Sequence, residues 1–533
     1  MPENLDAKKH SFLNRLIKSL FSVPDWISEN RADLLLFISG TAITVASCLH
    51  YLLTMLTWTQ PGFTLDDSWI HLVFARTIHE GRPWEYSPGY PSTGSTSPLW
   101  SVVLAPLFAL TGNTTQLILG TYLVSIAFYS LTTFLVGFLI SEATGRRIWG
   151  HLGMIAFVLL PRNTWLMLSG METPLFMFLL MLGIALLPKQ QLYYDMLLGG
   201  VMGLTYLSRP EGALLSLFVL LIRPALLYTK GVLNRRRILS LLAMIVIAAL
   251  VVSPWILHCL SVTGLPLPDT FYAKVHVPTP SEIEVWNFFW GLWITQHPFI
   301  VIGLVSFPLL IKARRPMSWL LGVSLLILYR LTNPYGALIN NARYLVPVFL
   351  FLLISAFTGG VFFFQSLLER FDSQKGSSDT VVVGFVVCLL FIVPSVPGYL
   401  DQAPFYGNAV KNINEQQLQI GLWLRYHTPE DAVLAIHDAG ALRFFSNRTV
   451  IDLAGLVSPE IIHSNMSGQE TLLYLHEQGC DYFVFFDDLF NYWAWQLGYA
   501  YEKIYTVHLD DNVISGRDTM SVFKIKWNET GLV

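Results

Sequence analysis

Two adjacent acidic residues, Asp66 and Asp67, follow the first long apolar run of the chain. After them, apolar residues such as Trp69, Val73 and Phe74 recur at helical spacing, which predicts an amphipathic helix in a membrane interface. The acidic pair would stand at the start of this helix, where the helix dipole favours an ionised carboxylate that can accept a proton. Asp is also a common helix cap, so the pair alone fits a structural role equally well.

Two basic residues, Lys274 and Arg343, lie near the expected outer ends of later helices. A cationic side chain at this depth could neutralise a lipid phosphate. The alternative is that each side chain only extends toward the surrounding headgroups. The same residues bear on a metal, because Asp66 and Asp67 could hold Mg²⁺ or Ca²⁺ through their oxygens, whereas Lys274 and Arg343 could supply the charge without one.

Further candidates for substrate binding stand in short polar segments between apolar runs: His71, Glu172, Arg209, Glu211, Asp269 and Tyr344. His71, one helical turn after Asp67, either orients that carboxylate or satisfies its place at the interface. Glu172 opens a helix, and its interaction with the helix dipole explains it as well as acceptor binding does. Arg209 and Glu211 flank Pro210 in a break between two helices and could pair with each other, which favours a structural role.

The composition indicates which kind of element positions these residues. Of 533 residues, 53% are hydrophobic and 13% are charged, and the mean hydropathy is +0.51. Soluble domains carry about 25% charged residues, so lipid is the expected solvent. The net charge of -3 points neither toward nucleic acid nor away from it, and we expect no nucleic-acid partner. The four cysteines are widely separated, which gives neither a disulfide framework nor a zinc pattern.

A bilayer core of roughly 30 Å needs about 20 apolar residues in each spanning helix. Apolar runs predict eleven such helices, near residues 33–58, 115–140, 148–168, 172–188, 195–208, 211–229, 238–260, 285–311, 316–330, 344–368 and 380–399. The run from Pro98 to Leu110 is too short to cross and predicts a helix at the interface. We therefore expect a cytoplasmic segment over residues 1–32 and a membrane domain over 33–400, with a first outer loop at 59–114.

The distribution of Lys and Arg gives this membrane domain an orientation, because cytoplasmic loops collect both residues. With the amino terminus inside, the inner segments hold most of the basic residues, among them Arg146, Arg147 and Arg235 to Arg237. The outer loops before residue 400 hold only Arg76, Arg82, Arg162, Arg209, Lys274, Arg330 and Arg343. Counting Pro98 to Leu110 as a spanning helix would move Arg146 and Arg147 outside, so the bias favours eleven helices over twelve.

An odd number of crossings places residues 401–533 outside the cytoplasm. Short β-rich runs at Val433 to His437, Thr449 to Leu453 and Tyr482 to Phe486 alternate there with helical patterns at Gln416 to Tyr426 and Glu470 to Gln478. This alternation predicts a small soluble α/β domain. The fold class expected for the whole chain is therefore an α-helical polytopic membrane protein with a C-terminal extracytoplasmic α/β domain.

Several motifs recur in one order along the chain, beginning with Asp66-Asp67 after the first membrane helix and Ser95-Thr-Ser-Pro-Leu-Trp100. The others are Ser169-Gly-Met-Glu172, Ser208-Arg209-Pro-Glu211-Gly212, Pro266-Leu-Pro-Asp269-Thr-Phe-Tyr-Ala-Lys274, Asn341-Ala-Arg343-Tyr344, Asp438-Ala-Gly-Ala-Leu442 and Ile451-Asp452-Leu-Ala-Gly455. Together they resemble the GT-C class of glycosyltransferases, and within it the terminal arabinofuranosyltransferase type and related bacterial membrane proteins. The resemblance covers most of residues 33–460. Asp269 departs from the related pattern, which more often has Asn there.

The resemblance implies an inverting sugar transfer from a polyprenyl-phosphate donor to a glycan, lipid or protein acceptor outside a bacterial inner membrane. It implies that the first acidic residue of the first outer loop is the base, so Asp66 is expected to take the proton and Asp67 to support it. The exchange of these two roles is the alternative. Lys274 and Arg343 would then bind the donor phosphate, and a divalent cation remains an open expectation.

Two other functions compete with this interpretation. A transporter would also have many helices, but inverted repeats and charged groups facing a midplane site are not evident in the sequence. A non-catalytic partner of a glycan-assembly complex could share the fold, and the presence of both Asp66 and Asp67 disfavours it.

Overall fold

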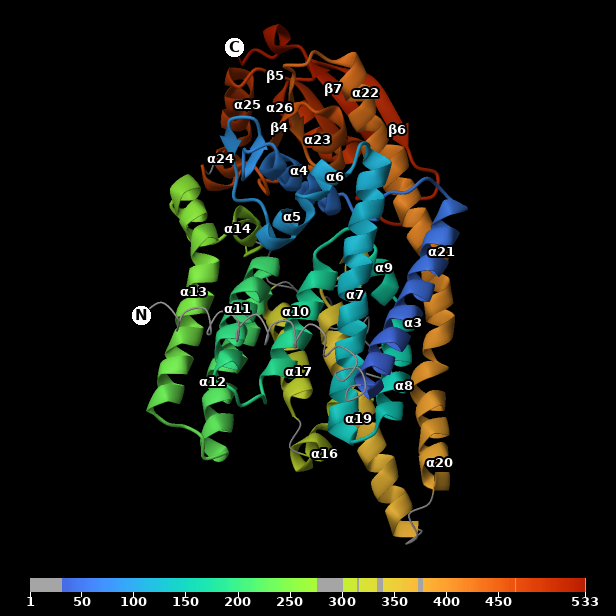
Figure 1. The fold of residues 1–533 in the computed structure, drawn as a ribbon. Helices are drawn as coiled ribbons and strands as arrows, with labels where there is room; N and C mark the ends of the chain where they lie inside the picture. The colour runs from blue at the N-terminus through green and yellow to red at the C-terminus, as the bar shows by residue number, and fades with distance from the viewer. Residues whose placement is uncertain are drawn as a thin grey trace, which may run out of the picture.

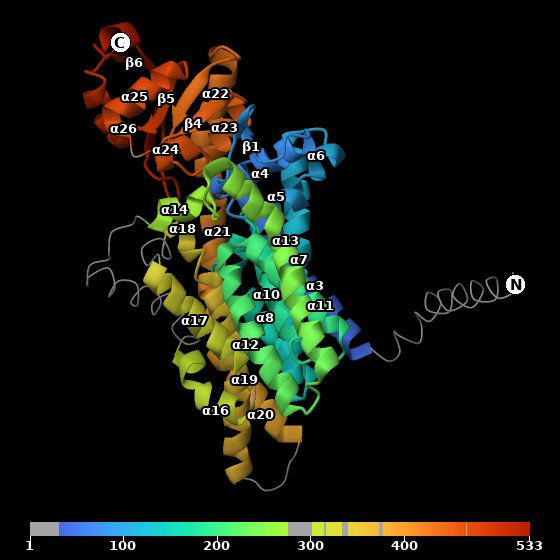
Figure 2. The ribbon, with the colours of Figure 1, turned by 90° about the vertical axis from the view of Figure 1, so that its left-hand side faces the viewer.

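The computed structural model describes residues 31–275, 301–313, 316–332, 339–371, 377–464 and 466–532. These residues form a bundle of long helices with an α/β domain at one end (Figure 1). The same arrangement is visible from the side, where the first outer loop lies between the bundle and the α/β domain (Figure 2). Most of the spanning helix predicted near residues 285–311 lies outside the described residues.

The bundle is built from helices that match most of the predicted runs. They are α3 (Arg31–Leu56), α7 (Thr114–Thr144), α10 (Thr173–Leu186), α11 (Tyr193–Ser208), α12 (Ala213–Thr229), α13 (Arg235–Thr263), α16 (Phe307–Lys312), α17 (Met317–Thr332), α19 (Val346–Phe371) and α20 (Ser377–Val387). In the described part, six helical stretches are long and apolar enough to cross a membrane. Small residues allow close packing, since a Cβ at Gly199 of α11 would collide with Met244 O of α13.

The predicted continuous helix over residues 148–168 is wrong, because the chain bends between α8 (Arg147–Val158) and α9 (Asn163–Met167). Pro161 lies in the bend and cannot donate a backbone hydrogen bond. Arg162 has a φ of 71°, a left-handed conformation that also ends a helix. The bend returns the chain to the end of the bundle where the first outer loop lies.

The first outer loop contains α4 (Asp67–His79), a short hairpin of β1 (Glu85–Ser87) and β2 (Tyr90–Pro91), α5 (Pro98–Leu104) and α6 (Leu107–Leu110). The amphipathic helix predicted after the acidic pair is α4, but its more polar side is also covered, since His71 is buried. Trp69 of α4 packs against Phe444 and Phe445 of the α/β domain, with ring centroids 4.9 and 4.7 Å away. The helix is thus held between the bundle and this domain.

The α/β domain is joined to the bundle by α21 (Ser395–Ile413), which follows α20 through a short π-helical turn at Cys388–Ile392. The domain boundary expected at residue 400 falls inside α21. The helices of the domain are α22 (Gln419–His427), α23 (Gly440–Ser446), α24 (Pro459–His463), α25 (Gly468–Glu477) and α26 (Asp487–Gln496).

Five strands form the sheet of this domain in the order β4-β3-β5-β7-β6. The predicted strands are β3 (Val433–Ile436), β4 (Thr449–Asp452) and β5 (Cys480–Phe486), which pair in parallel. The sequence analysis did not predict β6 (Tyr501–His508) and β7 (Thr519–Ile525), which add an antiparallel hairpin next to β5. Charged side chains interrupt the apolar pattern of β6, because much of that edge strand is exposed.

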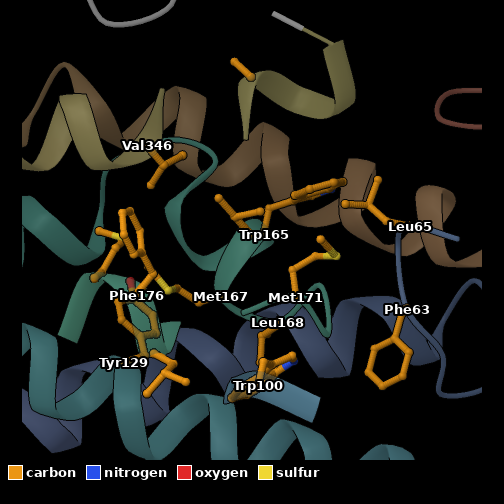
Figure 3. Packing of buried hydrophobic residues seen from close by; sticks show 14 of the residues in the cluster. Phe63, Leu65, Trp100, Tyr129, Trp165, Met167, Leu168, Met171, Phe176 and Val346 are labelled. Carbon is orange, nitrogen blue, oxygen red and sulfur yellow. The ribbon is translucent and has the colours of Figure 1, made fainter. Parts of the chain in front are cut away.

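Buried side chains beneath the first outer loop fix its position (Figure 3). The labelled cluster contains Phe63, Leu65, Trp100, Tyr129, Trp165, Met167, Leu168, Met171, Phe176 and Val346. The Trp100 indole N–H donates to Gly170 O at 2.9 Å, and the Ser68 hydroxyl donates to Ser169 O at 2.6 Å. Gly170 has a φ of +84°, a conformation open to glycine. These contacts hold the turn before α10 against the start of α4.

Candidate functional site

Asp66 is bound to the α/β domain. Its two carboxylate oxygens accept hydrogen bonds from Gly440 N and Ala441 N, both at 2.7 Å. A Cβ at Gly440 would collide with Asp66 O, so this approach requires glycine. Burial and the nearby Asp438 carboxylate raise the pKa of Asp66 well above its ordinary value, although the two N–H groups oppose the shift. Asp66 therefore acts as the attachment of α4 to α23.

Asp67 points to a different partner, although it is the next residue. Its Oδ2 accepts a hydrogen bond from Arg343 Nη2 at 2.6 Å, and its side chain is 38% exposed. Arg343 is almost completely buried, and its Nη2 also donates to the Tyr344 hydroxyl at 3.3 Å. Among the described residues, Nε and Nη1 of Arg343 have no hydrogen-bond partner. Two donors of a buried cation thus remain unused beside an accessible carboxylate.

The turn before Arg343 has an unusual backbone. Asn340, Asn341 and Ala342 have φ values of 50°, 60° and 56°, which residues other than glycine seldom adopt. Side chains from the neighbouring elements hold this turn: Arg162 Nε donates to Asn341 Oδ1, and Asn341 Nδ2 donates to Gln402 Oε1, both at 2.7 Å. The turn brings Arg343 to the end of the bundle beneath α4.

A second buried ion pair lies next to the first. Arg209 Nε donates to Glu172 Oε1, and His71 Nε2 lies 3.2 Å from Glu172 Oε2. Arg209 Nη2 also donates to Thr173 Oγ1 at 3.2 Å. Although burial opposes ionisation, Arg209 and His71 hold the pKa of Glu172 below its ordinary value. Arg209 therefore pairs with Glu172 rather than with the half-buried Glu211, and His71 meets Glu172 rather than Asp67.

Tyr344 joins the two ion pairs. The guanidinium carbons of Arg209 and Arg343 lie 5.3 and 5.1 Å from the centroid of its ring, within the range of cation–π attraction. We refer to Asp67, His71, Glu172, Arg209, Arg343 and Tyr344 as the acid–arginine cluster. The cluster unites residues from α4, from the turns before α10 and after α11, and from the turn before α19.

Asp269 takes a separate position, at the start of α14 (Asp269–Val275). His463 Nε2 lies 2.8 Å from Asp269 Oδ1, and Asp269 N donates to Thr93 Oγ1 at 3.2 Å. These contacts tie the segment after α13 to α24 and to the first outer loop. Lys274 is in α14, but its side chain lies outside the described part of the structure. His463 was not among the residues predicted from the sequence, since no motif marks it and its partner Asp269 lies 194 residues away.

The other polar residues of the outer-domain motifs make local contacts. Asp452 accepts hydrogen bonds from the N–H groups of Ala454, Leu456 and Val457, and His437 Nδ1 lies 2.9 Å from Asp438 Oδ1. Over the described ranges, no group of three or more His, Cys, Asp or Glu residues is arranged to hold a metal ion. Asp66 and Asp67, the pair considered for Mg²⁺ or Ca²⁺, are engaged by α23 and Arg343 respectively.

Comparisons with known proteins were made by sequence and by structure. The model of a family described as a domain of unknown function, DUF8728, matches residues 411–523, which is most of the α/β domain. No curated protein matches the chain.

Similar solved structures cover nearly the whole chain. ArnT from Cupriavidus metallidurans in the apo state is 15% identical with a TM-score of 0.55, over 92% of this chain and 98% of ArnT. ArnT from the same organism bound to undecaprenyl phosphate is 14% identical with a TM-score of 0.57, over 90% of this chain and 97% of ArnT. An Archaeoglobus fulgidus oligosaccharyltransferase tethered with an acceptor peptide is 14% identical with a TM-score of 0.56, over 93% of this chain and 74% of the oligosaccharyltransferase. The likeness shows the fold: the chain is an integral membrane protein with a GT-C fold and a C-terminal α/β domain, which confirms the predicted helical membrane fold with its α/β domain, while the number of spanning helices and the side of the membrane stay predictions.

Proposed function

We propose that this protein is a membrane glycosyltransferase that transfers a sugar from a polyprenyl-phosphate donor to an extracytoplasmic glycan, lipid or protein acceptor, with inversion. The observation that carries the proposal is the pair of Asp67 and Arg343. It sets an accessible carboxylate 2.6 Å from a buried guanidinium whose Nε and Nη1 have no partner among the described residues. The related fold of ArnT, a protein solved with undecaprenyl phosphate, supports a lipid-phosphate donor.

Arg343 is the residue we assign to the donor phosphate. A buried cation without full compensation costs free energy, and a phosphate oxygen on Nε or Nη1 would supply charge-assisted hydrogen bonds. Lys274, in α14, remains the second proposed phosphate ligand. Tyr344 acts as a positioning residue, because its ring and hydroxyl both contact the guanidinium group of Arg343, and Arg209 lies against the same ring.

Inversion requires that the acceptor hydroxyl attack from the face opposite the departing phosphate, and that a base take its proton as the bond forms. Asp67 meets this need better than Asp66, because it is 38% exposed whereas both oxygens of Asp66 accept backbone hydrogen bonds. Arg343 Nη2 donates to Asp67 Oδ2 and so orients this carboxylate. We therefore assign the proton transfer to Asp67 and the attachment of the loop to Asp66, which is the exchange of roles left open by the sequence.

Single-turnover transfer from a panel of purified polyprenyl-phosphate sugars tests this assignment. Asp67→Asn keeps the shape of the side chain but removes its basicity, so transfer should fall about 10²-fold or more. The matched control, Asp66→Asn, should lose less than about tenfold if its role is attachment. Loss of transfer in Asp66→Asn with normal rates in Asp67→Asn would give the base to Asp66, and normal rates in both would reduce the pair to structural residues.

The sidedness of the site is part of the proposal. The acid–arginine cluster and the α/β domain lie at one end of the bundle, and the connections α7–α8 and α12–α13, with Arg146, Arg147 and Lys230, lie at the other (Figures 1 and 2). Because basic loops favour the cytoplasm, we place the cluster outside a bacterial inner membrane. Reporter fusions after residue 375 and at the carboxyl terminus should report opposite sides, and a common location would overturn this topology.

A further inference from the structure

A polar cavity of about 270 Å³ lies between the first outer loop and the α/β domain. It is lined by Arg76, Glu80, Arg82, Pro88, Glu430, Arg443, Asn447, Arg448 and Thr449, and we refer to it as the arginine pocket. None of these lining residues belongs to the acid–arginine cluster. Arg76 comes nine residues after Asp67 in the same helix, which separates the two by about 14 Å along its axis at about 1.5 Å per residue.

Arg76 brings a partly satisfied guanidinium to this pocket from α4. Its Nη1 donates to Phe444 O at 3.3 Å, and its guanidinium carbon lies 5.0 Å from the centroid of the Phe444 ring. Its Nη2 is buried, and the described residues offer it no hydrogen-bond partner. The side chain therefore spans from the first outer loop to α23 and retains an unused donor.

Arg443 of α23 brings a second guanidinium to the pocket. The residue is 3% exposed, and its Nε donates to Tyr86 O at 3.2 Å. Its Nη1 is buried and, within the described ranges, likewise without a partner. Burial and the nearby Arg76 charge lower the pKa of Arg443 to about 10. At neutral pH Arg443 is still charged. Two like charges, on Arg76 and Arg443, therefore lie close together where the first outer loop meets the α/β domain, at an energetic cost.

The other charged residues of the pocket offset these two charges only in part, because Glu80 acts on Arg76 and Arg443 through its charge but forms no ion pair with either among the described residues. Arg448 uses Nε, Nη1 and Nη2 in hydrogen bonds to neutral oxygens of Thr428, Ser446 and Arg425. Glu80 is engaged by Arg82, which also pairs with Glu85. In the part of the chain that the structure describes, no ion pair joins a carboxylate to Arg76, Arg443 or Arg448. Backbone bridging accounts for Arg448 but leaves the buried donors of Arg76 and Arg443 unexplained.

We propose that the arginine pocket is a second anion site, which binds a phosphate group between Arg76 and Arg443. A tetrahedral oxyanion presents several acceptor oxygens, so one phosphate can receive hydrogen bonds from both guanidinium groups at once. Its charge relieves the repulsion between the two arginines. Because Arg76 belongs to the first outer loop and Arg443 to the α/β domain, the bound phosphate stabilises their contact and raises the unfolding temperature of the chain.

The test is a titration of the purified full chain with inorganic phosphate in detergent, at constant ionic strength with chloride as the reference anion. The unfolding temperature should rise with phosphate, as expected for a ligand of the folded state alone. Arg76→Gln and Arg443→Gln should each weaken the apparent phosphate affinity at least tenfold. The matched control is Arg517→Gln, since Arg517 is an exposed arginine of the same domain that pairs with Asp488, and it should keep the wild-type affinity.

The donor site is separated from this response by a further variant. Arg343→Gln should retain the stabilisation by phosphate, because Arg343 does not line the arginine pocket. Loss of the whole response in Arg343→Gln would place the phosphate at the acid–arginine cluster and overturn the proposal. The proposal is also overturned if phosphate and chloride stabilise equally, or if Arg76→Gln, which alters a half-buried residue, binds phosphate as the wild type does.

Nanodiscs distinguish the two sources of such a phosphate. If the group comes from a lipid, discs containing phosphatidylglycerol should stabilise the wild type but not Arg76→Gln, and should abolish the effect of added phosphate. If it comes from a soluble molecule, added phosphate should stabilise the protein equally in discs of phosphatidylcholine and of phosphatidylglycerol. Both results support the site, and a lipid effect that persists in Arg76→Gln contradicts a lipid source.

Discussion

The acid–arginine cluster can be compared with a second buried cluster at the opposite end of the bundle. There, Asp195 Oδ1 accepts from Arg223 Nε and Nη2 at 2.8 and 2.6 Å, and Asp195 Oδ2 accepts from Arg237 Nη1 at 2.8 Å and Ser240 Oγ at 2.7 Å. The remaining nitrogen of Arg223, Nη1, donates to the carbonyl oxygens of Leu187 and Lys189. Both clusters combine buried arginines with carboxylates, but in the Asp195 cluster every nitrogen of Arg223 has a partner.

The difference lies in what remains unsatisfied. In the acid–arginine cluster, Nε and Nη1 of Arg343, Nη1 of Arg209 and Nδ1 of His71 have no partner among the described residues. A fully satisfied buried network stabilises one arrangement of helices, whereas unused donors lower stability unless a ligand completes them. Residue types alone do not separate a structural ion pair from a binding site, but the count of satisfied donors does.

The largest effect on stability should follow from disrupting the Asp195 cluster. Asp195→Ala leaves Arg223 and Arg237 buried without a carboxylate, which typically costs about 3–5 kcal/mol. Thermal unfolding in detergent should show this loss, while the donor affinity of the remaining folded protein should be unchanged. Asp488→Asn is the control, because its pair with Arg517 is exposed and worth about 0–1 kcal/mol. Equal stabilities of the two variants would remove the distinction between the clusters.

In the acid–arginine cluster, we expect a substitution to change ligand affinity more than stability. Arg343→Gln removes the proposed phosphate ligand, so the affinity for undecaprenyl phosphate should fall by about 1.5–3 kcal/mol, the range for charge-assisted hydrogen bonds. Stability should change little, because its partner Asp67 is 38% exposed and can be hydrated. Arg223→Gln is the matched variant and should destabilise the protein without weakening binding. Unchanged affinity in Arg343→Gln would leave Arg343 as a structural residue.

A smaller effect is expected where the acid–arginine cluster meets the α/β domain. Gly440→Ala places a methyl group against Asp66 O, so α23 must move and the strain should cost about 1–3 kcal/mol. Gly200→Ala is the control, since a Cβ there meets no atom within 4 Å and alanine favours the helix. The difference between the unfolding free energies of the two variants measures the docking of α4 on α23, and equal values would mean that this contact contributes little.

The last effect depends on pH and concerns a buried carboxylate whose hydrogen bonds come from backbone N–H groups rather than from arginine. Burial raises the pKa of Asp452 to about 6, although three backbone N–H groups favour its charged form. The folded state therefore binds a proton more tightly than the unfolded state, so this group makes stability fall as pH rises from about 4 to 6. Asp452→Asn should remove this part of the slope in pH-dependent unfolding. A wild-type slope in Asp452→Asn would assign the slope to other groups.

Much of the fold could be predicted because local patterns report local burial. The apolar runs predicted α3, α7 and α13 without reference to the rest of the chain, and short β-rich runs predicted β3, β4 and β5. The break between α8 and α9 was missed although Pro161, Arg162 and Asn163 mark it, because the apolar residues before and after them were read as one run. The strand β6 was missed since its exposed residues do not alternate in polarity.

The site was only partly predictable from the same sequence. Its motifs identified Asp67, Glu172, Arg209 and Arg343 as polar residues at the ends of apolar helices, because charged groups in such a chain need a reason to be there. The partner of each residue was not determined by this reasoning. The sequence suggested that Arg209 could pair with its neighbour Glu211, whereas the structure pairs it with Glu172, 37 residues away.

What the sequence determined by itself was therefore the solvent of each segment: lipid for the apolar helices, water for the α/β domain, and a boundary region that carries the acidic pair. What only the tertiary structure decided was which partners Asp66 and Asp67 each contact. Adjacent residues at the start of a helix point in different directions, and their partners, Gly440 and Arg343, lie 374 and 276 residues further along the chain. Such contacts depend on how the turn before α19 and the α/β domain dock on α4, and no local pattern encodes that docking.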